Sequence, residues 1–200
     1  MTKEVVLSLA LTITVVAVTA DTPVSGQATS RERQLYVSVL DQAGAPVRDL
    51  QASDFVVRED GVRREVLRAR PATAPMQIAI LVDTSEAATN VLRYIRPAVL
   101  AFVQRIHENN EIAIITFGDP PAIIVEATSD LQALEKGANR LFPRPRTGAY
   151  LLDALFDAAQ GFERREASRP VILAIATEGI AFSNRGPERV MESITDSGAA

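Results

Sequence analysis

The sequence predicts an α/β fold, a doubly wound and mostly parallel sheet with helices on both faces, preceded by a small β module. Three continuous apolar runs have the length of strands, at 78–82, 112–117 and 171–176. Such runs are typical of strands that are buried on both faces of a parallel sheet. Segments with helical spacing separate the runs, and strands that alternate with helices form parallel sheets with right-handed crossovers.

The N-terminal segment predicts export to the periplasm or the extracellular space. Residues 5–20 contain only Val, Leu, Ile, Ala, Thr and one Ser and end in small residues, as in a secretory signal peptide cleaved after residue 20. The run is shorter than the roughly 20 apolar residues of a membrane span. An uncleaved anchor, or processing at another point, is the alternative. Residues 21–33 are polar and without periodicity, which indicates a flexible linker.

Residues 34–70 predict the small β module. Their apolar residues recur in strand-like segments, the first at 35–41, and Asp60-Gly61 separates two later segments. This dipeptide favours a type I′ hairpin turn, which needs a positive φ at both central residues. The module has few apolar residues, so we expect it to pack on its neighbour instead of forming a core of its own.

The remaining elements belong to a larger domain at 76–200. A short strand at 122–125 is expected to form a hairpin with the strand at 112–117. Pro97 lies inside the first helical pattern and should kink that helix or mark a late start. The helical patterns cover residues 91–106, 131–141, 151–159 and 187–194.

Composition narrows the function classes. With 21 Lys+Arg against 25 Asp+Glu the net charge is −4, and the basic residues are scattered, which argues against nucleic-acid binding. The sequence has no Cys and a single His, His107. Disulfide frameworks, Cys/His zinc sites, thiol catalysis and any serine triad not built around His107 are therefore excluded. His107 is expected to act as a cation at a helix C-terminus.

Oxygen-bearing side chains follow two of the buried runs. Residues 83–87 read DTSEA and residues 177–179 read TEG. In doubly wound sheets ligands bind beyond the carboxyl ends of the strands, where the strand order reverses. Carboxylates and hydroxyls there suit Mg²⁺ or Mn²⁺. Neither segment contains a glycine-rich phosphate loop, which disfavours a nucleotide site.

Four ordered segments together resemble a von Willebrand factor type A domain. They read IAILVDTSEA, EIAIITFGD, RTGAYLLDALFDA and RPVILAIATEG. The module before them, LYVSVLDQAGAPVRDLQASDFVVREDG, resembles a β element that precedes this domain in a group of exported bacterial proteins. The resemblance covers residues 35–200 and implies a Rossmann-like sheet. It also implies further strands and a helix, so we expect the domain to be C-terminally incomplete, as a truncated chain, a fragment or a chain completed by a partner.

The resemblance also implies a degenerate metal-ion-dependent adhesion site (MIDAS). Asp83 and Ser85 match the first two ligand positions of the family's DxSxS motif, and Ala87 stands at the third. The family's Thr falls on Ala149 and its Asp on Glu178. Asp83, Ser85 and Glu178 are thus the candidate ligands of a weakly bound Mg²⁺ or Mn²⁺, with lost ligands replaced by water.

Two alternatives to a metal remain for these side chains. Glu86 is close enough in sequence to join Asp83 and Glu178 at the metal. Without a metal these carboxylates repel one another unless they extend into solvent, and Arg185 or another arginine could supply the compensating charge. Asp83 and Ser85 could also simply cap the following helix, because both residue types accept hydrogen bonds from free N–H groups.

The function implied by the resemblance is that of an exported, non-enzymatic protein-binding or adhesion-type module without a membrane span after signal cleavage. A metal-free structural component of an envelope assembly is one alternative. A metal-assisted hydrolase using Asp83, Glu178 and a water is another, although no general base can be named. Asp153 is expected to be a solvated or capping carboxylate. The loop arginines form a solvated face or contact an acidic partner, and they are Arg140, Arg144 and Arg146.

Overall fold

The structure is a computed structural model that describes residues 32–200. The predicted signal peptide and residues 21–31 of the predicted linker lie outside the described residues. The chain divides into two units, Met1–Leu35 and Tyr36–Ala200, and residues 32–35 of the first unit form no helix or strand. Within residues 32–200, none of the helices has the length and apolar character that a membrane crossing requires.

A short hairpin is the main regular structure between residues 36 and 70. Strands β1 (Val57–Glu59) and β2 (Val62–Arg64) pair antiparallel. Asp60 and Gly61 between them have φ of 52° and 79°, so the hairpin turn predicted from this dipeptide is confirmed. The strand expected before residue 42 is not formed beyond one bridge, Leu40 to Pro46, because no neighbouring strand completes a ladder there.

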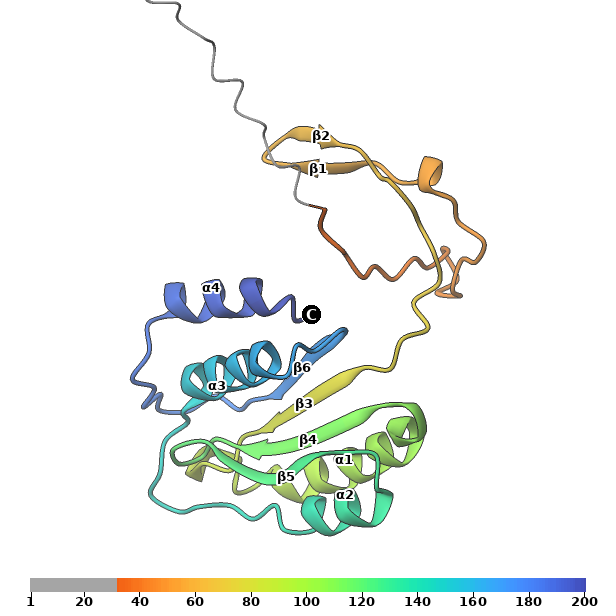
Figure 1. The fold of residues 1–200 in the computed structure, drawn as a ribbon. Coiled ribbons are helices and arrows are strands. Elements are labelled where there is room, and N and C mark those ends of the chain that lie inside the picture. The colour runs from red at the N-terminus through yellow and green to blue at the C-terminus, as the bar shows by residue number, and fades with distance from the viewer. Residues whose placement is uncertain (1–31) are drawn as a thin grey trace, which may run out of the picture. The chain divides into compact units, whose positions relative to one another are not determined.

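A four-stranded sheet forms the centre of the larger domain (Figure 1). Its strand order is β5-β4-β3-β6, where β3 is parallel to β4 and β6 and antiparallel β5 pairs with β4. The strands span Gln77–Val82 (β3), Glu111–Thr116 (β4), Ala122–Thr128 (β5) and Pro170–Ile175 (β6). Because β4 and β6 flank β3 on opposite sides, the strand order reverses at the carboxyl end of β3.

Helices cover both faces of this sheet, which confirms the doubly wound α/β prediction (Figure 1). Helices α1 and α2 pack on one face, α3 packs on the other, and α4 packs against α3. Helix α1 begins before Pro97, so the predicted late start does not occur. The helices span Leu92–Ile106 (α1), Leu131–Ala138 (α2), Leu151–Arg164 (α3) and Pro187–Ser197 (α4).

The core explains why the apolar runs are continuous. Ile80, Leu81 and Val82 of β3 are each 0% exposed. Ile80 and Val82 belong to the cluster under α1 and α2, whereas Leu81 belongs to the cluster under α3. Successive residues of a strand point to opposite faces, so a strand covered on both sides needs an apolar residue at every position.

The end of the chain lies beside β6. The backbone N–H of Ala200 donates to the carbonyl of Pro170 at 3.2 Å, and the N–H of Ile172 donates to the carbonyl of Ala200 at 2.9 Å. Residues after α4 therefore meet the edge of the sheet in the way that a neighbouring parallel strand does.

Candidate functional site

The two polar segments predicted to form a site lie side by side at the carboxyl ends of β3 and β6. Val82 and Ile175 are partners in the parallel ladder, and the N–H of Asp83 extends it by donating to the carbonyl of Ile175 at 2.9 Å. Asp83 and Ser85 are 0% and 1% exposed. The strand reversal thus places a buried carboxylate where sequence reasoning expected a ligand site.

Three hydrogen bonds hold the Asp83 carboxylate. Its Oδ1 accepts from the backbone N–H of Ser85 at 2.8 Å. Its Oδ2 accepts from the backbone N–H of Thr177 at 3.1 Å and from the Thr177 hydroxyl. Hydrogen bonds to a buried carboxylate compensate for lost hydration, so both oxygens of Asp83 are satisfied by its neighbours.

The expected helix-capping role fits Asp83 better than Ser85. Ser85 occupies the N-cap position of a short 3₁₀ turn, Glu86–Ala88, but its side chain makes no capping hydrogen bond. Its Oγ is buried without a hydrogen-bond partner among residues 32–200. The Ser85 backbone N–H, by contrast, is taken up by Asp83.

The other acidic candidates do not gather around Asp83. Glu178 is exposed and makes no hydrogen bond or ion pair with the described residues. Glu86 is also exposed, and its Oε2 accepts from the backbone N–H of Arg146 at 2.9 Å. Within the described part of the chain no group of three or more His, Cys, Asp or Glu side chains could hold a metal ion.

The donor set does not fit a tightly held divalent cation. Ala87 and Ala149 offer only methyl groups, and Ala149 uses its backbone to pair with the loop after β6. Both oxygens of Asp83 already accept hydrogen bonds, and among the candidate ligands the Ser85 hydroxyl is buried without a partner in the described residues. A Mg²⁺ ion needs near-octahedral oxygen coordination, so most of its shell here would have to be water.

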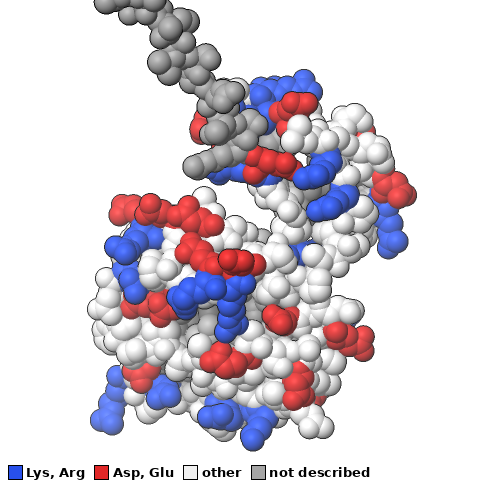
Figure 2. All heavy atoms as spheres, in the orientation of Figure 1, with Lys and Arg blue, Asp and Glu red and all other residues white. Residues whose placement is uncertain are grey.

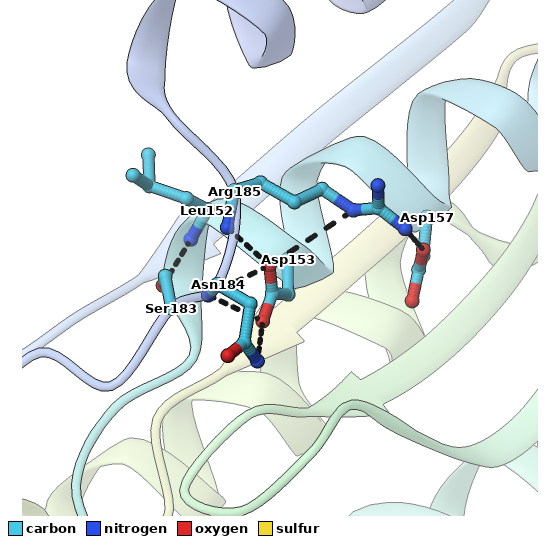
Figure 3. A network of polar contacts seen from close by, with 6 residues as sticks. All are labelled: Leu152, Asp153, Asp157, Ser183, Asn184 and Arg185. Carbon is cyan, nitrogen blue, oxygen red and sulfur yellow. Dashed lines mark hydrogen bonds and ion pairs between the residues drawn. The ribbon is translucent and has the colours of Figure 1, made fainter.

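Arg185, offered above as a counter-charge for Asp83, binds a different carboxylate (Figure 3). Its Nε lies 3.9 Å from Oδ1 of Asp153, and its Nη2 lies 3.8 Å from Oδ1 of Asp157. The guanidinium also lies over the ring of Phe156, with Cζ 3.8 Å from the ring centroid. Arg185 therefore does not supply the counter-charge for Asp83, because its guanidinium contacts side chains of α3.

Asp153 is a buried anchor and not a solvated carboxylate. Asp153 is 7% exposed. Its carboxylate accepts hydrogen bonds from the backbone N–H groups of Asn184 and Arg185, each at 3.0 Å (Figure 3). The hydroxyl of Ser183 accepts from the N–H of Leu152 at 3.0 Å. These bonds fasten the loop that follows β6 to the start of α3. The apolar neighbours of Asp153 in LLDAL were the sequence signal for its burial.

Gly118 allows the turn after β4 to press against the turn after β3. A Cβ at this position would lie 2.1 Å from the backbone N of Ser85 and 2.1 Å from the carbonyl carbon of Thr84. The N–H of Phe117 donates to the carbonyl of Val82 at 3.1 Å and extends the same contact. No sequence pattern pointed to this glycine as part of the site.

Ile180 and Phe182 form an exposed apolar strip in the loop that follows Thr177, the hydrogen-bond partner of Asp83. Ile180 and Phe182 are 71% and 47% exposed, and both lie in the loop after β6. Backbone hydrogen bonds join this loop to Ala149, and the Phe182 ring meets Tyr150 edge-on with centroids 6.1 Å apart. The strip is therefore fixed in place although it faces solvent.

His107 occupies the position expected of it. It follows the last residue of α1, and its Nδ1 lies 3.2 Å from the carbonyl oxygen of Ser129. His107 precedes the start of β4, whereas Asp83 follows the end of the parallel neighbour β3, so the two residues lie at opposite ends of the sheet.

Comparison with known proteins identifies relatives of the domain. The family model of the von Willebrand factor type A domain matches residues 78–180. The structure is similar to BatB from Bacteroides thetaiotaomicron, with a TM-score of 0.52, 16% identity, and coverage of 62% of this chain and 63% of that one. It is also similar to an aerotolerance-related membrane protein from Bacteroides fragilis, with a TM-score of 0.51, 21% identity, and coverage of 62% and 64%.

A third similar structure is proximal thread matrix protein 1 from the mussel byssus, described as having a zinc-occupied MIDAS motif. Its TM-score is 0.53 at 16% identity, with coverage of 64% of this chain and 34% of that one. The chain spans less than two thirds of the length of each of these three relatives. No curated protein matches the sequence.

Proposed function

We propose that this chain, which belongs to the von Willebrand factor type A domain family, is an exported, non-enzymatic module that binds another protein at the carboxyl end of its sheet. The observation that carries the proposal is the exposure of Ile180 and Phe182 on a loop that Asp153 and Ala149 hold rigid. A fixed apolar strip in solvent is favourable for association, because the free loop needs little further ordering on binding.

Partner binding does not require a metal ion in this proposal. The three hydrogen bonds to Asp83 compensate for the burial of its charge, which in a complete MIDAS is one task of the cation. A Mg²⁺ or Mn²⁺ ion held by Asp83, Ser85 and Glu178 would bind weakly, with water in place of the ligands missing at Ala87 and Ala149.

The same geometry argues against the hydrolase alternative. Metal-assisted hydrolysis needs carboxylate oxygens that are free to hold a metal or to activate a water. Both oxygens of Asp83 are occupied by Ser85 and Thr177, and Glu178 extends into solvent without a partner among the described residues.

Export rests on the sequence of residues 1–20, whose apolar run ends in small residues. Cleavage of this segment would release the module into the periplasm or the extracellular space. N-terminal sequencing of the protein purified from its native envelope fraction tests this part of the proposal: a mature chain that begins at Asp21 supports it, and an intact Met1 contradicts it.

The binding surface is tested by affinity capture from envelope extracts with and without a chelator. The variant Ile180→Ser/Phe182→Ser should lose the captured protein, because it removes the exposed apolar strip. A control, Met191→Gln, changes a residue that is 60% exposed on α4 and should retain it. Equal retention by both variants would favour the alternative of a structural component that uses another surface.

A further inference from the structure

A pocket lies beside Thr84, the residue that follows Asp83. It has a volume of about 280 Å³ and opens at the carboxyl ends of β3 and β4. Ile124, one of its lining residues, packs against the core cluster under α1 and α2, whereas Asp83 points to the side of β6. The lining residues are Thr84, Thr116, Ile124, Arg140, Phe142, Pro143 and Arg144.

The pocket combines guanidinium groups with hydroxyls. Arg140 and Arg144 are both exposed, and the Arg140 side chain makes no hydrogen bond or ion pair with the described residues. The hydroxyls come from Thr84 and Thr116, which are 2% and 6% exposed. The Thr84 Oγ1 is buried and has no hydrogen-bond partner among residues 32–200. The Arg140 guanidinium and the Thr84 hydroxyl are thus donors without an acceptor among the described residues, which is the arrangement a bound anion would complete.

A carboxylate of the chain itself already meets one of these arginines. Oδ2 of Asp119 lies 3.4 Å from Nη1 of Arg144, with the two side chains 48% and 53% exposed. An ion pair this exposed contributes little to stability, so a better placed carboxylate can displace Asp119. The contact shows which kind of group the Arg144 guanidinium accepts at this position.

The wall of the pocket is held in shape before any ligand arrives. Leu141 is fully buried, and its carbonyl accepts hydrogen bonds from Nε and Nη2 of Arg96. The same guanidinium lies 4.8 Å from the centroid of the Phe142 ring. The N–H of Arg144 donates to the carbonyl of Thr84 at 2.7 Å. A rigid wall lowers the entropic cost of binding.

Size and lining distinguish the class of ligand. The volume lies just below the range of about 300–1,000 Å³ that is typical of small-molecule sites, which favours a single side chain over a cofactor. Ile124, Phe142 and Pro143 would cover an aliphatic stem, and the arginines would meet its charged end. Among the lining residues no run of glycines offers the backbone N–H groups that phosphate sites use.

We propose that this pocket binds a glutamate or aspartate side chain from an acidic segment of the protein partner. The proposal deepens the function proposed above and rests on it for the identity of the ligand as a protein. The electrostatic attraction for the acidic segment comes from the pocket and not from the molecule as a whole, because the net charge is −4. Acidic and basic side chains are interspersed on the face of the molecule drawn in Figure 2. The loop arginines predicted to contact an acidic partner thus include two, Arg140 and Arg144, that line a defined pocket.

The test titrates the full chain with acetylated, amidated hexaglutamate, which carries side-chain carboxylates only, and with hexaglutamine blocked in the same way. Hexaglutamate should bind and hexaglutamine should not. The variant Arg140→Gln/Arg144→Gln should weaken hexaglutamate binding at least tenfold. The charge-matched control Arg105→Gln/Arg164→Gln, on exposed positions of α1 and α3, should change it less than twofold. Equal weakening by the two variants, or no hexaglutamate binding at millimolar concentration, overturns the proposal.

A second variant separates the pocket from general electrostatic attraction. Thr84→Val removes a hydroxyl that has no partner among the described residues, so the fold should keep its stability while hexaglutamate binding falls at least threefold. Unchanged binding by a folded Thr84→Val variant overturns the assignment of the peptide to this pocket. If an equimolar amount of inorganic phosphate displaces hexaglutamate, the pocket is a general oxyanion site and the proposal of a carboxylate ligand is overturned.

The outcome is independent of the apolar strip. Ile180→Ser/Phe182→Ser should bind hexaglutamate as the unchanged chain does, because neither residue lines the pocket. If hexaglutamate binds and Ile180→Ser/Phe182→Ser still captures the partner, the proposal for the apolar strip is contradicted and the proposal for the pocket is supported. If the partner is lost and the peptide never binds, the pocket fails alone.

Discussion

Asp83 and Thr177 lie at the carboxyl ends of neighbouring parallel strands, and the carboxylate of Asp83 accepts hydrogen bonds from both the backbone N–H and the hydroxyl of Thr177. This pair ties β3 to β6 at the point where the strand order reverses. It also satisfies a buried negative charge with groups of the chain itself. The proposal that this domain binds its partner without a cation rests on that relationship.

Asp83→Asn tests the energetic weight of this pair. Ser85 and Thr177 both donate hydrogen bonds to Asp83. The Asn amide keeps one acceptor oxygen, but its NH₂ group would face one of these donors instead of accepting from it. We expect a loss of about 1–3 kcal/mol in the free energy of unfolding, measured with urea. The control, Glu178→Gln, changes an exposed side chain and should stay within about 0.5 kcal/mol. A similar small effect for both would mean that the hydrogen bonds of Asp83 contribute little.

Two glycine substitutions should have opposite effects on stability. Gly118→Ala places a Cβ 2.1 Å from backbone atoms of Thr84 and Ser85, so the turns after β3 and β4 must separate, at a cost of about 1–3 kcal/mol or more. Gly161→Ala, inside α3, meets nothing closer than 3.9 Å and should stabilise the chain by up to about 1 kcal/mol. Thermal melts of both variants measure this, and a destabilised Gly161→Ala together with a neutral Gly118→Ala would contradict the packing described.

The anchor at Asp153 should be separable from the neighbouring ion pair at Asp157. Asp153→Ala leaves the N–H groups of Asn184 and Arg185 without their acceptor and should cost about 3–5 kcal/mol, because one partner of a buried charged network is removed. Asp157→Ala removes a contact at 3.8 Å from a side chain that is 54% exposed and should cost less than about 1 kcal/mol. Hydrogen exchange gives a local readout: the amides of Asn184 and Arg185 should lose protection in Asp153→Ala under conditions where this variant is folded, and protection that persists would argue against the anchor.

The fold was largely predictable because its signals are local. Continuous apolar runs gave β3, β4 and β6, since each position of a strand covered on both faces must be apolar. The Asp60-Gly61 turn followed from the backbone geometry that these two residue types tolerate. The strand expected before residue 42 failed because alternation of apolar residues says nothing about whether a partner strand is present.

The site was less predictable because it depends on contacts between distant segments. The sequence placed Asp83 at the strand end, yet it could not show that Thr177 and Ser85 would donate to both of its oxygens. The contact of Arg185 with α3 also arises from the path of the loop after β6, which no periodicity encodes. The same holds for the pocket beside Arg140, whose walls come from the turn after β3, from β4 and β5, and from residues after α2.

Metal dependence is the most direct test of the central claim. Thermal melts of the full chain should be recorded in a chelator and then in about 5 mM Mg²⁺ or Mn²⁺, a concentration that reveals even weak binding. A ligand that binds only the folded state raises the free energy of unfolding in proportion to ln(1 + [L]/Kd). We expect a cooperative transition whose midpoint differs by less than about 1 °C between chelator and metal, which corresponds to only a small change in the free energy of unfolding. A clear upward shift that Asp83→Asn abolishes would contradict it and would make the divalent cation part of the binding site.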